Sequence, residues 1–85
     1  MSRAGIRELT VAPLDFGWAI RIPGAAGEML FHSGAAAEAA GRRLAERLSR
    51  AGLPAKLVVR LRDGSVGGRF LFPPRLDADP AQLAA

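Results

Sequence analysis

Two runs of alternating apolar residues, which together span residues 56–72, meet at the dipeptide Asp63-Gly64. Asp-Gly between two such runs is a strong signal for a β-hairpin with a two-residue type I′ turn, because both residues tolerate the positive φ that this turn requires. The pairs that this turn predicts are Arg62–Ser65, Leu61–Val66, Val59–Gly68 and Leu57–Phe70. The chain is therefore expected to contain an antiparallel pair of strands over these residues.

This register divides the hairpin into an apolar face and a basic face. The pairs that join Leu57, Val59 and Leu61 to the second run all fall on the apolar face. A shift of the pairing by one residue would mix the two sets of side chains, so the clean separation favours this register. We expect the apolar face to be buried and the basic face to be exposed. The basic face carries Lys56, Val58, Arg60, Arg62, Gly67, Arg69 and Leu71.

Three shorter strands are predicted before the hairpin. The expected elements are a strand over residues 7–13, a turn over 14–17, a strand over 18–22, a connection over 23–27 and a strand over 28–32. The first two strands alternate in polarity, as half-buried strands do. The orientation of the third strand stays open, because the pair Leu30 and His32 fits the interior as well as the pair Met29 and Phe31 does.

An amphipathic helix is predicted over residues 35–51. Ser33 stands where its hydroxyl can accept a backbone N–H of the first turn. Gly52 stands where a left-handed residue ends a helix, and Pro54 prevents continuation. The apolar residues with helical spacing are Ala37, Ala40, Leu44, Leu48 and Ala51. This stripe is expected to face the sheet.

Together these elements predict a single α+β domain of β-β-β-α-β-β order, with a mostly antiparallel sheet and one helix packed on one face. The strand order stays open between 3-2-1-4-5, in which the first and fourth strands are parallel neighbours, and 3-2-1-5-4, which is fully antiparallel. The predicted core consists of Leu9, Val11, Trp18, Ile20, Ile22, Ala37, Ala40, Leu44, Leu48, Leu57, Val59, Leu61, Val66, Phe70 and Phe72.

The length of 85 residues is that of one domain. Residues 1–6 are predicted to be a disordered N-terminus, residues 7–73 the folded domain, and residues 74–85 a C-terminal tail that is mostly flexible. The tail has a helix-start signature at Asp79-Pro80. The alternative is that the tail docks through Leu76 and Leu83.

Charge and cysteine content bear on the class of protein. The pI of 11.4 is high mainly because few groups titrate at alkaline pH, and the net charge is only +4, so basicity is weak evidence for nucleic-acid binding. The absence of cysteine excludes a disulfide framework and a thiolate zinc site and fits a reducing cytoplasm. No apolar run has the length of a signal peptide or a membrane span. We expect a cytoplasmic protein without membrane association.

The element order and several short motifs resemble a family of small bacterial domains. The motifs are Leu9-Thr10-Val11-Ala12-Pro13, Gly17-Trp18-Ala19-Ile20, Glu38-Ala39 in the helix and Asp63-Gly64 in the last turn. The family is catalogued as a domain of unknown function, number 2188, and the resemblance covers most of the chain from Leu9 to Phe72. It implies the β-β-β-α-β-β layout and no catalytic residues. The insertion at 23–27 and the proline-rich tail depart from the family pattern.

No set of side chains in the sequence has the spacing of a catalytic or metal site. His32 is the only histidine and is expected to bond to backbone at a strand end rather than to bind a metal. Ser33 is explained by its capping role, and the carboxylates stand in turns or beside arginines. We therefore predict a chain that is not an enzyme and that uses no cofactor or metal.

The basic face is compatible with two functions. The first is a non-catalytic interaction domain that binds an unknown protein partner or itself, as a homodimer formed through a sheet face or edge. The alternative is contact with the phosphates of duplex nucleic acid, which needs cations on a suitable surface but no exposed aromatic rings. We favour the first. The candidate contact residues in either case are Arg21, Lys56, Arg60, Arg62 and Arg69.

Overall fold

The computed structural model of the chain describes residues 6–75. Its elements are β1 (Arg7–Leu14), β2 (Gly17–Arg21), β3 (Glu28–Phe31), α1 (Gly34–Arg50), β4 (Ala55–Arg60) and β5 (Val66–Phe72). The α+β class and the β-β-β-α-β-β order are therefore confirmed. The predictions for the two ends of the chain fall mainly on residues 1–5 and 76–85, which lie outside the described residues.

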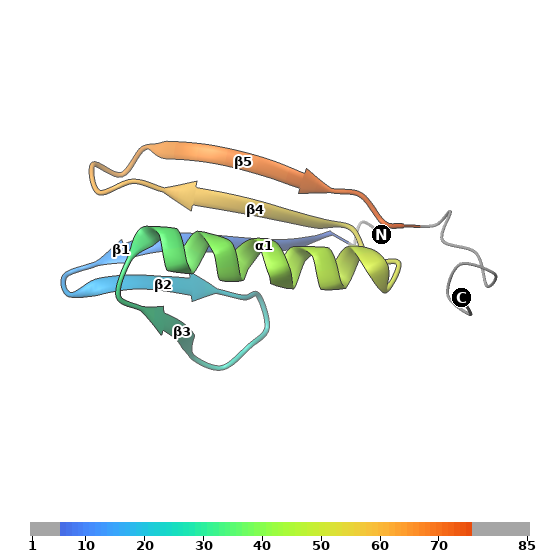
Figure 1. Cartoon of the computed structure of the whole chain (residues 1–85), viewed down its shortest axis with the longest axis horizontal. Coiled ribbons are helices and arrows are strands. Elements are labelled where there is room, and N and C mark those ends of the chain that lie inside the picture. The colour runs from blue at the N-terminus through green and yellow to red at the C-terminus, as the bar shows by residue number, and fades with distance from the viewer. Residues whose placement is uncertain (1–5, 76–85) are drawn as a thin grey trace.

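The five strands form one sheet in the order β3-β2-β1-β4-β5. This is the first of the two orders that the sequence left open. β1 and β4 are parallel neighbours, and the other three pairs of adjacent strands are antiparallel. α1 connects β3 to β4 and lies across one face of the sheet (Figure 1).

Both ends of α1 are fixed by the residues that the sequence indicated. The Ser33 hydroxyl accepts a hydrogen bond from the backbone N–H of Ala36, at 3.1 Å. At the other end Gly52 has a φ of +87°, which glycine adopts without the steric cost of a side chain. The N–H of Leu53 then donates to the carbonyl of Leu48 at 2.9 Å and closes the last turn.

The core lies between α1 and the sheet. Ala37 and Ala40 face the sheet as predicted, but the rest of the buried stripe of the helix differs from the predicted one. Small residues point to the sheet: Ala37, Ala40, Gly41, Ala45 and Ser49 are buried. Leu44 and Leu48 are only half-buried and pack at the edge of the core. The close packing of small residues against the sheet leaves these two leucines on the flank of α1 that is nearer to β2.

The sheet contributes the large side chains of the core. The fully buried ones are Leu9, Val11, Ile20 and Leu57, and the residues packed around them include Trp18, Ile22, Phe31, Val59, Phe70 and Phe72. Phe31 faces the interior because it pairs with Trp18, which answers the open question about β3. Leu61 was predicted in the core, and this is wrong: it is 43% exposed.

The hairpin turn differs from the prediction, and this explains the exposure of Leu61. Leu61 donates to the carbonyl of Ser65 at 2.8 Å and accepts from the N–H of Gly64 at 3.0 Å, so the loop has three residues instead of two. Only Gly64 has a positive φ in this loop. The pairs Arg62–Ser65 and Leu61–Val66 are therefore wrong.

A compensating irregularity restores the register deeper in the hairpin. Arg60 pairs with Val66, whereas Val59 pairs with Gly68, so β5 contains one extra residue at Gly67. The pair Val59–Gly68 is thus confirmed, as is the pair of Leu57 with Phe70. The core end of the hairpin has the predicted pairing although its turn does not.

Candidate interaction surface on the open sheet face

No element of the described chain covers the sheet face opposite α1, which we call the open face (Figure 1). Residues that are paired on adjacent strands point to the same side, and alternate residues of a strand point to opposite sides. Because Leu9, Val11 and Leu57 point to α1, the residues between them form the open face. The open face consists of Glu8, Thr10, Ala12, Leu14, Ala19, Arg21, Glu28, Leu30, Lys56, Val58, Arg60, Arg69 and Leu71.

Four of the five predicted contact residues lie on this face. Lys56 and Arg60 stand on β4, and Arg69 stands beside them on β5, opposite Val58. We call these three side chains the cationic patch. Arg21 lies further away, on β2. For these residues, the sequence therefore predicted correctly which side of the sheet the side chain faces.

Arg62 does not share this face, because the three-residue loop redirects it. Its Nη1 donates to the backbone carbonyl of Leu14 at 2.9 Å. Its guanidinium also lies over the indole ring of Trp18, 5.4 Å from the centroid. Arg62 therefore ties the β4–β5 hairpin to the β1–β2 hairpin.

Part of the positive charge on the open face is already engaged within the chain. Arg21 forms an ion pair with Glu28 on the neighbouring strand. Arg60 lies near the carbonyl of Gly64, with 3.4 Å between its Nη1 and that oxygen. Lys56 has Glu8 as its cross-strand neighbour. The field of the cationic patch is consequently weaker than the number of arginines suggests.

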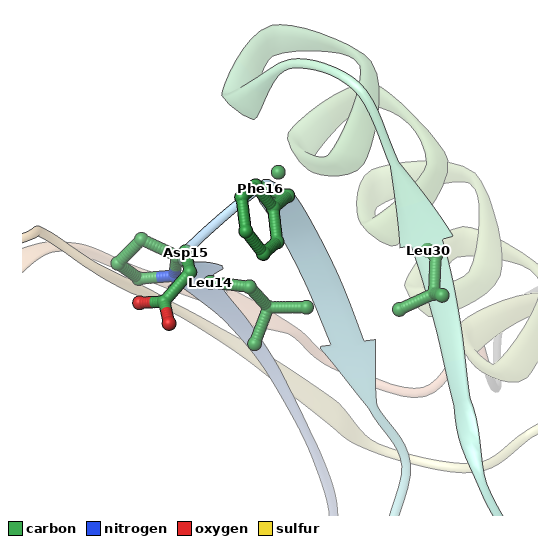
Figure 2. Close-up of a pocket in the computed structure, with 6 residues that line it drawn as sticks. Leu14, Asp15, Phe16 and Leu30 are labelled. Carbon is green, nitrogen blue, oxygen red and sulfur yellow. The ribbon is translucent and has the colours of Figure 1, made fainter.

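The other half of the open face is apolar and hollowed. A hollow of about 550 Å³ is lined by Pro13, Leu14, Asp15, Phe16, Gly17 and Leu30. Phe16 is 97% exposed and Leu30 is 69% exposed. Figure 2 shows Leu14 and Phe16 at the turn between β1 and β2, Leu30 on β3, and the Asp15 carboxylate on the side away from Leu30. Two large apolar side chains thus flank a hollow that is open to solvent.

Small residues bring the walls of this hollow together. Ala12 and Ala19, which pair across β1 and β2, are both buried although no helix covers them. At Gly17 a β-carbon would fall 2.5 Å from the carbonyl oxygen of Phe31. Any side chain at position 17 would therefore push β3, and with it Leu30, away from the β1–β2 turn.

The apolar hollow was not predicted from the sequence. The side on which Leu30 lies depends on the β2–β3 register, in which Leu30 pairs with Ala19, and the sequence left this register open. Phe16 could have indicated an exposed apolar surface, because an aromatic residue in a tight turn between two strands cannot readily reach the core.

The described residues hold no arrangement that points to catalysis. Among residues 6–75, no three His, Cys, Asp or Glu side chains gather as a metal site would require. His32 is exposed, and the Ser33 hydroxyl is engaged in the helix cap. Hydrogen bonds from the Ser65 hydroxyl and the Ser65 N–H lower the pKa of Asp63 below its ordinary value of 3.8. That carboxylate stabilises a turn.

No protein-family model, no curated protein and no solved structure matches this chain. The resemblance to a domain family therefore stays a prediction. In the part of the chain that the structure describes, no helix has the length and apolar character needed to cross a membrane.

Proposed function

We propose that this chain is a non-catalytic interaction domain that associates with a second copy of itself through the hollow on its open face. The observation that carries the proposal is the exposure of Phe16 and Leu30 around one apolar hollow. Contiguous apolar surface on a small domain is typical of protein contact sites. Scattered single apolar residues would carry no such meaning.

A second copy fits this surface because the surface complements itself. Each copy has both a projecting ring, Phe16, and a hollow that can receive a ring, as a two-fold interface requires. Each copy also has a carboxylate beside the hollow, Asp15, and cations on the same face. Two cationic patches in direct contact would repel, so the interface is centred on the hollow.

The size of the domain supports the same proposal. A chain of 85 residues buries a modest share of its surface on folding, roughly 60 to 65% for a domain of this size. Association of two copies would bury more apolar area and stabilise the fold by mass action. The proposal includes a cytoplasmic location, which the cysteine-free composition favours.

The oligomeric state tests the proposal. We expect sedimentation equilibrium to show a monomer–dimer equilibrium for the unmodified chain and a monomer for Leu30→Asp, because burial of a carboxylate in the interface is unfavourable. Leu71→Asp is the matched control, since Leu71 is 74% exposed on the same face but lies outside the hollow. A monomeric wild type at every concentration, or equal loss of dimer in both variants, would overturn the proposal.

Contact with duplex phosphates is a second candidate, and the cationic patch is the observation that favours it. Such binding weakens steeply with salt, because each neutralised phosphate releases a counterion. Fluorescence anisotropy of a short DNA duplex at two salt concentrations tests it with the double variant Arg60→Ala/Arg69→Ala. Salt-sensitive binding that the double variant loses would support phosphate contact. Absence of binding, or binding that the variant retains, would exclude this face as the site.

A further inference from the structure

The flank of α1 that faces β2 carries an apolar groove. Its volume is about 340 Å³, and it is lined by Leu9, Ile22, Leu44, Arg47, Leu48 and Ala51. The groove arises because β2 ends at Arg21, whereas α1 continues to Arg50 past the end of that strand (Figure 1). The half-burial of Leu44 and Leu48 is a consequence of this mismatch in length.

The opposite flank of α1 is better covered, although a smaller hollow of about 180 Å³ lies there near Glu38 and Phe70. There Arg42 lies over the ring of Phe70, 4.2 Å from its centroid, and also bonds to Glu38. Nearer the end of the helix, the Ser49 hydroxyl donates to the carbonyl of Pro73 at 2.6 Å. The groove on the β2 flank has no corresponding cover from residues 6–75.

The groove also has a cation at its rim. Arg42 and Arg50 of α1 each pair with a glutamate four residues earlier. Arg47, which lines the groove, makes no ion pair with any described residue. An occupant that fits this site would therefore carry large apolar side chains together with a carboxylate.

The described chain ends on the opposite flank of α1, so that only the width of the helix separates it from this groove. The backbone N–H of Arg75 donates to the carbonyl of Ser49 at 2.8 Å, and Ser49 directly follows the groove residue Leu48. Ten residues follow in the sequence, Leu76-Asp77-Ala78-Asp79-Pro80-Ala81-Gln82-Leu83-Ala84-Ala85. An extended chain of that length reaches about 33 Å. The groove lies across a single helix, whose diameter is about 10–12 Å.

We propose that the segment 76–85 of the same chain occupies this groove, with its leucines against Leu44 and Leu48 and its aspartates at Arg47. The segment has the required chemistry, because it holds two leucines, two aspartates and no cation. Intramolecular docking is favoured over a separate partner, because the point of attachment at Ser49 keeps the segment at a high effective concentration. This inference concerns the helix layer and does not depend on self-association through the open face.

A paramagnetic label on the full chain tests the proposal. Because the chain has no cysteine, Gln82→Cys provides a single position for a nitroxide. In the ¹⁵N spectrum we expect the amides of Ile22, Leu44 and Leu48 to be broadened and those of Leu30 and Arg69 on the open face to be spared. Groove amides that are broadened no more than the open-face amides would overturn the proposal.

A mixed sample identifies the source of the segment. Nitroxide-labelled ¹⁴N chains are mixed with unlabelled ¹⁵N chains, and intramolecular docking predicts no broadening of the groove amides in the ¹⁵N chains. Broadening there would assign the groove to the segment of a second copy and would overturn docking within one chain. A dimer formed through the open face would leave this readout unchanged.

Substitutions then test the chemistry of the contact. In the labelled chain we expect Leu83→Ser to reduce the broadening at Leu44 and Leu48 to the level of the open face, whereas Leu71→Ser leaves it intact. Arg47→Glu should weaken the contact, and Asp77→Lys/Asp79→Lys in the same chain should restore it. Failure of the charge exchange to restore broadening would contradict the ionic part of the proposal. Unchanged broadening in Leu83→Ser would contradict the apolar part.

Discussion

Gly41 of α1 lies directly against Leu57 of β4: a β-carbon at position 41 would fall 2.9 Å from Cδ1 of that leucine. Leu57 is 0% exposed and stands in the middle of the sheet, paired with Leu9 and Phe70. Glycine inside a helix costs up to about 1 kcal/mol relative to alanine. Here it allows the helix to approach the sheet, which explains its presence.

The first prediction is that Gly41→Ala destabilises the fold. The substitution improves helix propensity by up to about 1 kcal/mol, but the added methyl overpacks a buried contact, which typically costs about 1–3 kcal/mol. We therefore expect a lower midpoint in urea unfolding. Leu57→Val should relieve the clash, so Gly41→Ala should cost less in that background. A stabilised Gly41→Ala chain would show that the contact relaxes freely.

The second prediction compares two leucines of the interior. Leu57→Ala is expected to lower the free energy of unfolding by about 2–5 kcal/mol, as core truncations do. Leu44→Ala should cost clearly less, because Leu44 is only half-buried and lines the groove on the β2 flank. Urea unfolding of the two variants checks the order. An equal loss in both would mean that Leu44 is as well covered as Leu57.

The helix illustrates what periodicity does and does not determine. The spacing of apolar residues predicted where α1 lies and that Ala37 and Ala40 face the sheet, and both are confirmed. The sequence could not fix the rotation of the helix about its axis. That rotation depends on Leu57, which fills the space under Gly41 and turns the side of Ala45 to the sheet instead of the side of Leu44.

In the hairpin, the pairing of the strands could be predicted from the sequence, but the geometry of the turn could not. The alternation of apolar residues determined the pairing of Leu57 with Phe70, because a shift would bury cations. The turn depends instead on local bonds around Asp63 and on the extra residue at Gly67. The same limit applies to the open face. The cations on β4 and β5 follow from alternation along the strands, whereas the hollow depends on how β3 pairs with β2.

The third prediction concerns Ser49, which links α1 to the end of β5. Its hydroxyl donates to the carbonyl of Pro73, and its own carbonyl accepts from Arg75. Because Ser49 is buried, Ser49→Ala leaves an acceptor without its partner, which costs about 1–3 kcal/mol. We expect lower stability and faster hydrogen exchange of the Arg75 amide. Ala39→Ser on the exposed side of α1 is the control and should change stability by less than about 0.5 kcal/mol.

The fourth prediction is a pH dependence that arises from Asp63. Its carboxylate accepts hydrogen bonds from the Ser65 hydroxyl at 2.6 Å and from the Ser65 N–H at 2.9 Å, and these bonds lower its pKa below 3.8. Because the pKa is lower in the folded state than in the unfolded state, the charged form favours folding. This contribution is complete above the unfolded pKa and is lost as pH falls through the folded pKa.

A carbon-detected NMR titration of the Asp63 carboxyl group measures this effect. In Ser65→Ala the hydroxyl donor is absent, so the pKa of Asp63 should rise toward 3.8, while the bond from the backbone N–H keeps part of the shift. The difference in the free energy of unfolding between the wild type and Ser65→Ala should narrow as the pH falls through the pKa values of Asp63 in the two chains. Ser33→Ala, which removes a hydroxyl from the distant helix cap, should leave the Asp63 titration unchanged. A titration that is identical in the wild type and Ser65→Ala would show that the hydroxyl contact does not hold the turn in solution.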